Sequence, residues 1–181
     1  LALVEQLRAT MRLRPDDLQG QELLMRNEAA LGRFADAAAA QARVIALRGP
    51  AATAEDHAIH AELMIHAAGG IVSPEAERAL TEALRRNPAN GRALFNAGIM
   101  LMQIDRYDQA FELWRRHIAT AAHDDPYAPA MRSRIMDIAE RAGALRYTPP
   151  PVPAPAAALP GPTAAEIEGA EALSPGERRE M

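Results

Sequence analysis

The chain has no cysteine and no lysine, and only one tryptophan, three tyrosines and three phenylalanines among its 181 residues. The lack of cysteine excludes disulfides, thiolate metal sites and cysteine nucleophiles. Aromatic and β-branched residues are both sparse, which argues against a β-sandwich core. The sequence also lacks an apolar run long enough to cross a membrane. These absences direct the search toward a helical protein with a small-residue core.

Alanine supplies much of the 49% hydrophobic content, and it is the best helix-forming residue. The net charge of −4 argues against a general nucleic-acid-binding protein, which would need a basic face. The chain begins at Leu1 inside a helical pattern and shows no signal peptide. We therefore expect a targeting or anchoring segment to precede Leu1.

Four prolines divide the first two thirds of the chain at nearly regular intervals. Pro15, Pro50, Pro88 and Pro126 lie 35, 38 and 38 residues apart, and each separates two amphipathic runs. Proline lacks an amide proton and disfavours helix in the residue before it, so it marks helix ends. The spacing predicts a repeated helical unit slightly longer than the 34-residue tetratricopeptide repeat.

The clearest unit spans residues 91–120 and reads as two helices joined by a tight turn. Gly98 and Ala110 are small residues placed where the two helices must touch, and Trp114 lies one turn after Ala110. A larger side chain at either small position would separate the helices. This pattern resembles the tetratricopeptide repeat, a binding unit without chemistry of its own.

Two further units precede it. In the first, residues 17–48, helices at 18–31 and 34–47 flank Gly32, and Ala37 is the small contact residue. In the second, residues 53–86, the first helix covers 54–67 and ends at a glycine pair. Ser73 and Pro74 then open the next helix as N-cap and first helical residue, followed by the small residue Ala76.

Single helices at residues 1–14 and 126–142 are expected to cover the two ends of the array, giving about eight helices in total. The predicted repeat domain is residues 1–147. Residues 148–181 form a second segment, which begins with an extended proline-rich linker. We expect a short helix at 163–173 and the start of another at the C-terminus. The predicted fold class is all-α, a right-handed superhelical tetratricopeptide repeat array of about three repeats with capping helices.

Beyond the generic motif, residues 1–145 resemble the periplasmic repeat domain of the CcmI/CycH family of cytochrome c biogenesis proteins. The resemblance is carried by LVEQLRATMRLRPDDLQG, by the ALGRFADAAAAQ turn, by SPEAERALTEALRRNPANGRAL after the glycine pair, and by RYDQAFELWRR. The tail GPTAAEIEGAEALSPGERREM resembles the segment that follows the repeats in α-proteobacterial members. The first unit departs from the repeat pattern at Gln21 and Met25, and the third at His117.

The resemblance implies an apocytochrome c chaperone within the haem-ligation machinery, and neither an enzyme nor a cofactor protein. It implies that the domain binds the C-terminal helix of apocytochrome c in a concave groove and passes it to other haem-ligation subunits. It also implies a periplasmic domain, anchored in the inner membrane by segments outside this chain. The alternative is a generic protein-interaction scaffold in the bacterial envelope.

In stacked repeats the first helix of each unit lines the concave face. A helical partner needs both apolar anchors and polar groups that set its register, and the expected face offers both. Arginines on it are expected to meet carboxylates of the client, and an asparagine its backbone. The predicted partner-binding residues are Glu22, Arg26, Ala58, Glu62, His66, Arg92, Phe95, Asn96, Ile99 and Met102.

His57 and His60 lie three residues apart on one predicted helix, a spacing that two metal ligands can have. No zincin-type motif accompanies them, and a third ligand is not evident, so we interpret them as packing or face-lining imidazoles. No serine has a nucleophile-elbow context, and the glycines form no phosphate loop. No metal, cofactor or catalytic residue is therefore predicted.

Overall fold

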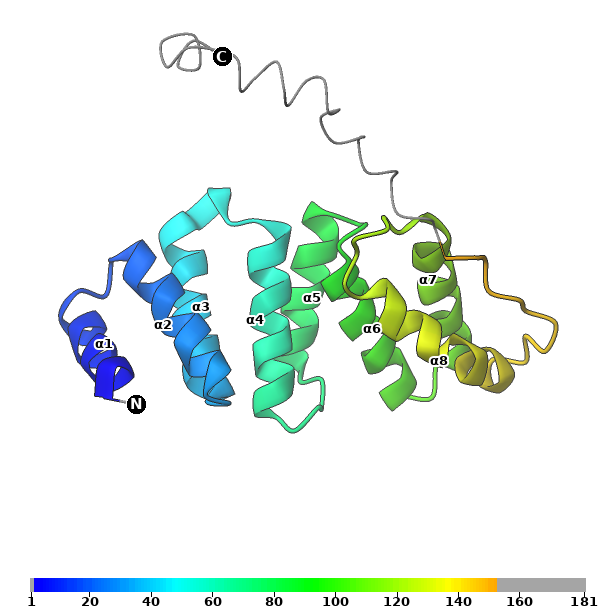
Figure 1. The fold of residues 1–181 in the computed structure, drawn as a ribbon, viewed down its shortest axis with the longest axis horizontal. Helices are drawn as coiled ribbons and strands as arrows, with labels where there is room; N and C mark the ends of the chain where they lie inside the picture. The colour runs from blue at the N-terminus through cyan, green and yellow to red at the C-terminus, as the bar shows by residue number, and fades with distance from the viewer. Residues whose placement is uncertain (1, 153–181) are drawn as a thin grey trace, which may run out of the picture. The chain divides into compact units, whose positions relative to one another are not determined.

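A computed structural model describes residues 2–152, and all regular structure within that range is helical. Figure 1 shows the helices following one another along the long axis of this part of the chain. In order, the elements are α1 (Ala2–Leu13), α2 (Leu18–Ala30), α3 (Phe34–Arg48), the short 3₁₀ helix η1 (Gly49–Ala51), α4 (Ala54–Ala67), α5 (Pro74–Arg86), α6 (Gly91–Gln103), α7 (Tyr107–Thr120) and α8 (Ala128–Arg141).

Consecutive helices pair as hairpins, and the hairpins stack. The pairs α2–α3, α4–α5 and α6–α7 are the three predicted units, while α3–α4 and α7–α8 contacts join neighbours. The first helices α4 and α6 also pack on each other. The all-α repeat prediction, including its three units and two flanking helices, is confirmed. The chain has no helix between residues 2 and 152 that is long and apolar enough to span a membrane.

The helices begin where side chains can replace missing backbone partners. Thr53 accepts a hydrogen bond from the N–H of Asp56, whose carboxylate in turn accepts one from the N–H of Thr53, 2.7 Å away. This reciprocal capping box satisfies two amides that the helix itself leaves free. Asp17, Ser73 and Asn90 cap α2, α5 and α6 in the simpler one-way form.

Two hairpin turns reach the same geometry with different residues. Gly32 has φ of +72°, and Asp105 takes its place in the third unit with φ of +57°. In both turns the next arginine donates its N–H to a carbonyl five residues back, Arg33 to Glu28 at 2.9 Å and Arg106 to Leu101 at 2.8 Å. Such a bond is part of a common helix C-cap, and aspartate is among the few side chains that tolerate its left-handed residue.

Small residues allow close helix approach at the predicted positions. Ala37, Ala76 and Ala110 are completely buried. At Gly98 an added Cβ would lie 2.0 Å from Nε1 of Trp114, so only glycine leaves room for the indole. The indole N–H donates to the carbonyl of Leu94 at 3.1 Å, which fixes the ring across the α6–α7 contact.

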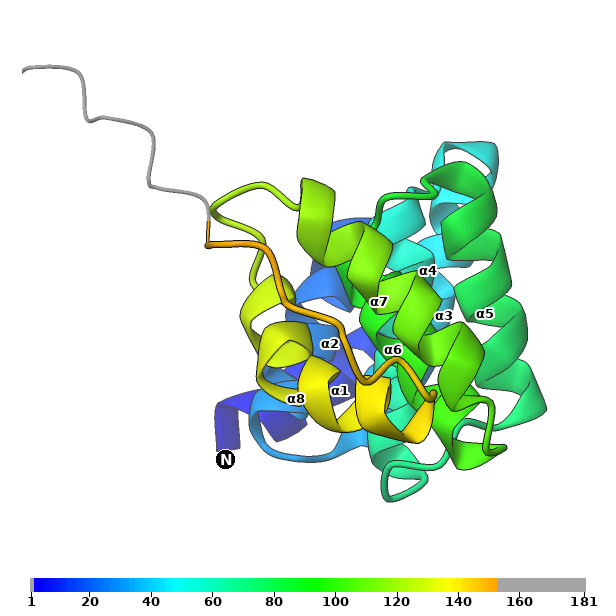
Figure 2. The same cartoon turned by 90° about the vertical axis from the view of Figure 1, so that its right-hand side faces the viewer.

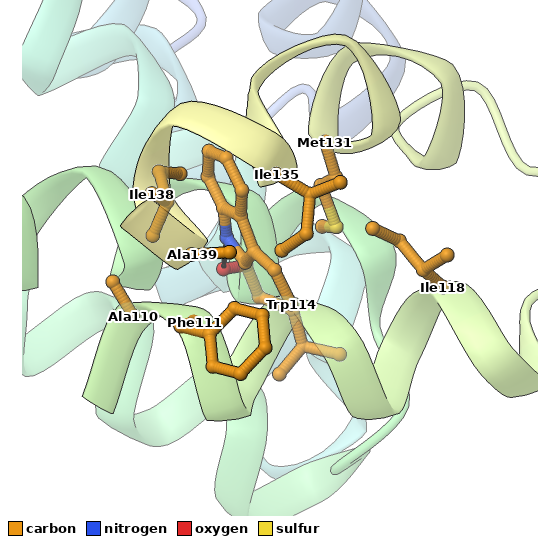
Figure 3. Packing of buried hydrophobic residues seen from close by; sticks show 9 residues of the cluster. Ala110, Phe111, Trp114, Ile118, Met131, Ile135, Ile138 and Ala139 are labelled. Carbon is orange, nitrogen blue, oxygen red and sulfur yellow. Dashed lines mark hydrogen bonds between the residues drawn. The ribbon is translucent and has the colours of Figure 1, made fainter. Parts of the chain in front are cut away.

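The largest apolar cluster lies at the C-terminal end of the array. Trp114 packs there with Phe111 and with α8 residues that include Ile135 and Ile138, as Figure 3 shows. The segment after α8 returns over this core, seen in orange in Figure 2. Tyr147 meets the edge of Phe111 with ring centroids 4.9 Å apart. The compact unit therefore extends to Pro150. The helix expected at 163–173 lies outside the described residues, so its prediction stays untested.

The N-terminal end has a different core. α1 buries only Met11, and its contact with the first hairpin is made largely by ion pairs. Glu28, completely buried, accepts from the Nε of Arg8 at 3.0 Å and from its terminal nitrogen at 2.6 Å. Arg33 pairs with Glu5 at 2.9 Å across the same joint. A cleft of about 370 Å³ remains beside these groups.

Candidate partner-binding face

Residues from two successive first helices and from the loop before α8 converge around Arg92. Its Nε donates to Glu55 at 2.8 Å, and a terminal nitrogen pairs with Glu62. Tyr127, just before α8, donates its hydroxyl to Glu62 at 3.2 Å, and the guanidinium lies 5.2 Å from the centre of its ring. We call Glu55, Glu62, Arg92 and Tyr127 the Arg92 cluster. The face formed by α4, α6 and the start of α8 is called the first-helix face.

Burial and neighbouring charge act against each other at Arg92. Burial disfavours its charged form, but the carboxylates of Glu62 and Glu55 outweigh burial and raise the pKa of the guanidinium. The pKa of Tyr127 is raised by burial and by the charge of Glu62. The tyrosine therefore remains a neutral donor, and two carboxylates face one guanidinium. The cluster carries one net negative charge.

The loop before α8 holds Tyr127 in place. One carboxylate oxygen of Asp125 accepts from the N–H of Tyr127 at 2.8 Å and from that of Ala128 at 3.1 Å. The other lies 2.9 Å from Nε2 of His117 on α7. An added Cβ on Gly91 would approach that same oxygen to 2.6 Å, so glycine is needed where α6 begins. Asp125 thus satisfies two backbone amides at the start of α8.

Phe95 connects the cluster to the core beneath it. Its ring stacks on Trp114 with centroids 5.4 Å apart and an angle of 7°, and it lies 5.7 Å from the ring of Tyr127. Ile99 and Met102 are also half-buried and pack against the same apolar cluster. We call Phe95, Ile99 and Met102 the apolar floor, because they form the partly exposed apolar surface of α6 above this cluster.

Two predicted residues do not reach the surface. Ala58 is fully buried in the alanine-rich contact of α4 with α5. Asn96 is 4% exposed, and its amide donates to the carbonyl of Arg92 at 3.0 Å in its own helix. Successive residues of an α-helix are rotated by about 100° around the helix axis. An error of one position in the assumed repeat register therefore assigns a buried side chain to the exposed face.

The remaining predicted residues lie toward the N-terminal repeat. Glu22 pairs with Arg48 at 2.6 Å, whereas Arg26 is exposed and has no ion pair within residues 2–152. His66 is exposed, and its ring stacks on Phe34 at 4.8 Å. The structure thus brings Glu62, Arg92 and Phe95 together, while Glu22 and Arg26 belong to α2.

Repeat register predicts Glu55 as an inward residue of the second unit, although it is not among the ten selected partner-binding residues, whereas Tyr127 was not predicted. Glu55, Arg92 and Tyr127 follow one another at intervals of 37 and 35 residues, close to the proline spacing. Glu55 and Arg92 are each the second residue of their helix, whereas Tyr127 is the N-cap of α8 and lies two positions earlier in that register. The same register extended into α8 would select Pro129 and not Tyr127, whose place in the cluster depends on the loop that Asp125 holds.

His57 and His60 lie on α4 and are partly buried. Burial lowers the pKa of both imidazoles, and at His57 the charge of Arg86 lowers it further. No cluster of three or more potential metal ligands is present between residues 2 and 152.

No protein-family model matches the chain. Three similar proteins are each named cytochrome c-type biogenesis protein CycH. The protein from Rhizobium meliloti is 32% identical over 129 residues, which cover 71% of this chain and 33% of that protein. Those from Bradyrhizobium diazoefficiens and Pseudomonas aeruginosa are each 30% identical over 75% and 86% of this chain. The chain spans about a third of the length of these relatives. It belongs to the CcmI/CycH family of cytochrome c-type biogenesis proteins.

Proposed function

We propose that this repeat domain serves cytochrome c biogenesis as a chaperone that binds the C-terminal helical region of apocytochrome c. The relatives' names, which refer to cytochrome c-type biogenesis, carry this proposal. The fold supports a binding role, because helical-hairpin arrays use their first helices to hold extended or helical partners.

The first-helix face has the composition that an amphipathic helix requires. Phe95, Ile99 and Met102 supply apolar surface, and the Arg92 cluster supplies polar groups next to it. Methionine adapts its shape to different partners, which suits the binding of several clients. We place the domain in the periplasm and infer that it acts with other haem-ligation subunits, by binding and not by catalysis.

The proposal is tested by titrating the 181-residue chain with a synthetic peptide from the C-terminal helix of a c-type apocytochrome. The expected result is saturable binding at micromolar concentration or tighter, lost when the same residues are scrambled. Equal response to both peptides would instead support a generic scaffold. Absence of binding by the native peptide would contradict the chaperone proposal.

A matched pair of surface variants tests whether the binding face extends from α4 and α6 onto α2, the first helix of the first unit. Repeat register places Leu23 on the inward side of α2, where it is 50% exposed, and Ile104 in the α6–α7 turn is 61% exposed. Leu23→Ser should weaken binding about tenfold if it removes one buried apolar anchor of about 1.5 kcal/mol, whereas Ile104→Ser should not. This pair is preferable to truncating Phe95, because that change removes a ring stacked on Trp114.

A further inference from the structure

The Arg92 cluster combines an excess of negative charge with partial exposure. The side chain of Glu55 is 46% exposed, whereas those of Glu62 and Arg92 are 20% and 23% exposed. Glu55 is held in place by Arg92 and by the side-chain amide of Asn90, which donates to it at 2.8 Å. The net negative charge therefore reaches solvent mainly through a positioned carboxylate.

Arg92 itself is poorly available to an incoming anion. Two carboxylates already bind its guanidinium, and the ring of Tyr127 covers one of its faces. A partner carboxylate placed here would approach two like charges and only one opposite charge. Like charges placed opposite each other at an interface disfavour a partner. This arrangement speaks against the sequence-based expectation that Arg92 meets client carboxylates.

We infer that the first-helix face selects a helical segment presenting a lysine or arginine beside apolar side chains, with Glu55 as the charge-selecting residue. The cation would meet the exposed carboxylate of Glu55, and the neighbouring apolar side chains would cover Phe95 and Met102. We choose a basic partner over an acidic one because a positive charge complements the two carboxylates that face the single guanidinium of Arg92. That the segment comes from apocytochrome c rests on the proposed function, whereas the charge preference does not.

The test uses one designed amphipathic peptide of about 15 residues in three versions, with lysine, glutamine or glutamate at the central polar position. Affinity for the 181-residue chain should fall in the order lysine, glutamine, glutamate. An exposed ion pair contributes up to about 1 kcal/mol, and the glutamate version replaces attraction with repulsion. We therefore expect a lysine-to-glutamate affinity ratio of about fivefold in low salt, decreasing as salt screens the charges.

The variant Glu55→Gln keeps the side-chain shape and removes the charge. It should reduce the lysine-to-glutamate affinity ratio about threefold, because one exposed ion pair is lost. Glu77→Gln is the matched control, because it removes the same charge from an exposed position on α5, which belongs to the second helix of its hairpin. Equal affinity for the three peptides, or equal effects of the two variants, would overturn the inference.

Failure of the inference is distinguishable from failure of the proposed function. An apocytochrome peptide that binds without any effect of Glu55→Gln contradicts the charge-selecting role alone. A lysine-bearing designed peptide that binds, together with an apocytochrome peptide that does not, contradicts the chaperone proposal alone. Absence of binding by every peptide contradicts both.

Discussion

Gly98 and Trp114 show how single residues determine the spacing of a helical hairpin. The glycine is required by the indole that covers it and not by an unusual backbone angle, because Gly98 lies within regular helix. In a helix interior, alanine is ordinarily favoured over glycine by about 1 kcal/mol. At this position the steric conflict with Trp114 should reverse that preference.

Gly98→Ala is expected to destabilise the protein by about 1–3 kcal/mol, the usual cost of overpacking a core. Urea unfolding monitored by circular dichroism measures the change. Combining it with Trp114→Phe should recover part of the loss, because the smaller ring vacates the contested space. Additive effects of the two substitutions would show that the contact with Trp114 is not the cause.

The histidines of α4 give the stability a predictable pH dependence. Burial lowers the pKa of His57 and His60 in the folded protein, so the unfolded chain binds their protons more readily. Their stabilising effect is therefore complete above the unfolded pKa of about 6.5 and is lost as the pH falls below it. The double variant His57→Gln, His60→Gln should flatten the stability curve between about pH 7.5 and 5.5. An unchanged slope would contradict this assignment.

At the scale of elements, α1 is held differently from the other helices. It buries little apolar surface, and its main contact is the pair of Arg8 with the fully buried Glu28. One oxygen of Glu28 has no hydrogen-bond partner, although Arg33 lies 3.6 Å away. Such a pair gives little net stability while intact, yet removing one partner leaves an expensive buried charge.

Arg8→Ala should release α1 without unfolding the array, because the buried carboxylate of Glu28 loses its partner at this joint alone. Hydrogen exchange should accelerate within residues 2–13 and remain slow in α7 and α8. Arg12→Ala provides the control, since Arg12 is exposed on the same helix. Equal exchange in the two variants would mean that the Arg8–Glu28 pair does not hold α1 in place.

The elements were predictable because their signals are local. Thr53, Ser73 and the four spaced prolines mark where helices begin and end, and Ala37 and Ala110 mark where they touch. The Arg92 cluster was not predictable in the same way, because its contacts join residues 30, 37 and 65 positions apart. Those pairings depend on helix stacking and side-chain rotamers, which periodicity alone does not specify.

At the scale of the whole described domain, apolar packing strengthens toward the C-terminal end. Trp114, Ile135 and their neighbours form the largest cluster, whereas Gln21, Glu28 and Gln41 are buried in the first repeat. The first-helix face spans this gradient, with its apolar floor attached to the well-packed end. A partner helix on this face would therefore lie over the largest apolar cluster of the described residues.

The most direct test of the account is to map where the C-terminal apocytochrome peptide binds, by NMR chemical-shift changes in the isotope-labelled chain. We predict that the largest changes fall on Glu62, Arg92, Phe95 and Tyr127, together with neighbouring residues of α4, α6 and α8. The exposed outer side of α5, including Glu75 and Glu77, should change little. Saturable binding whose largest changes fall on α5, with the first-helix face unaffected, would contradict the account.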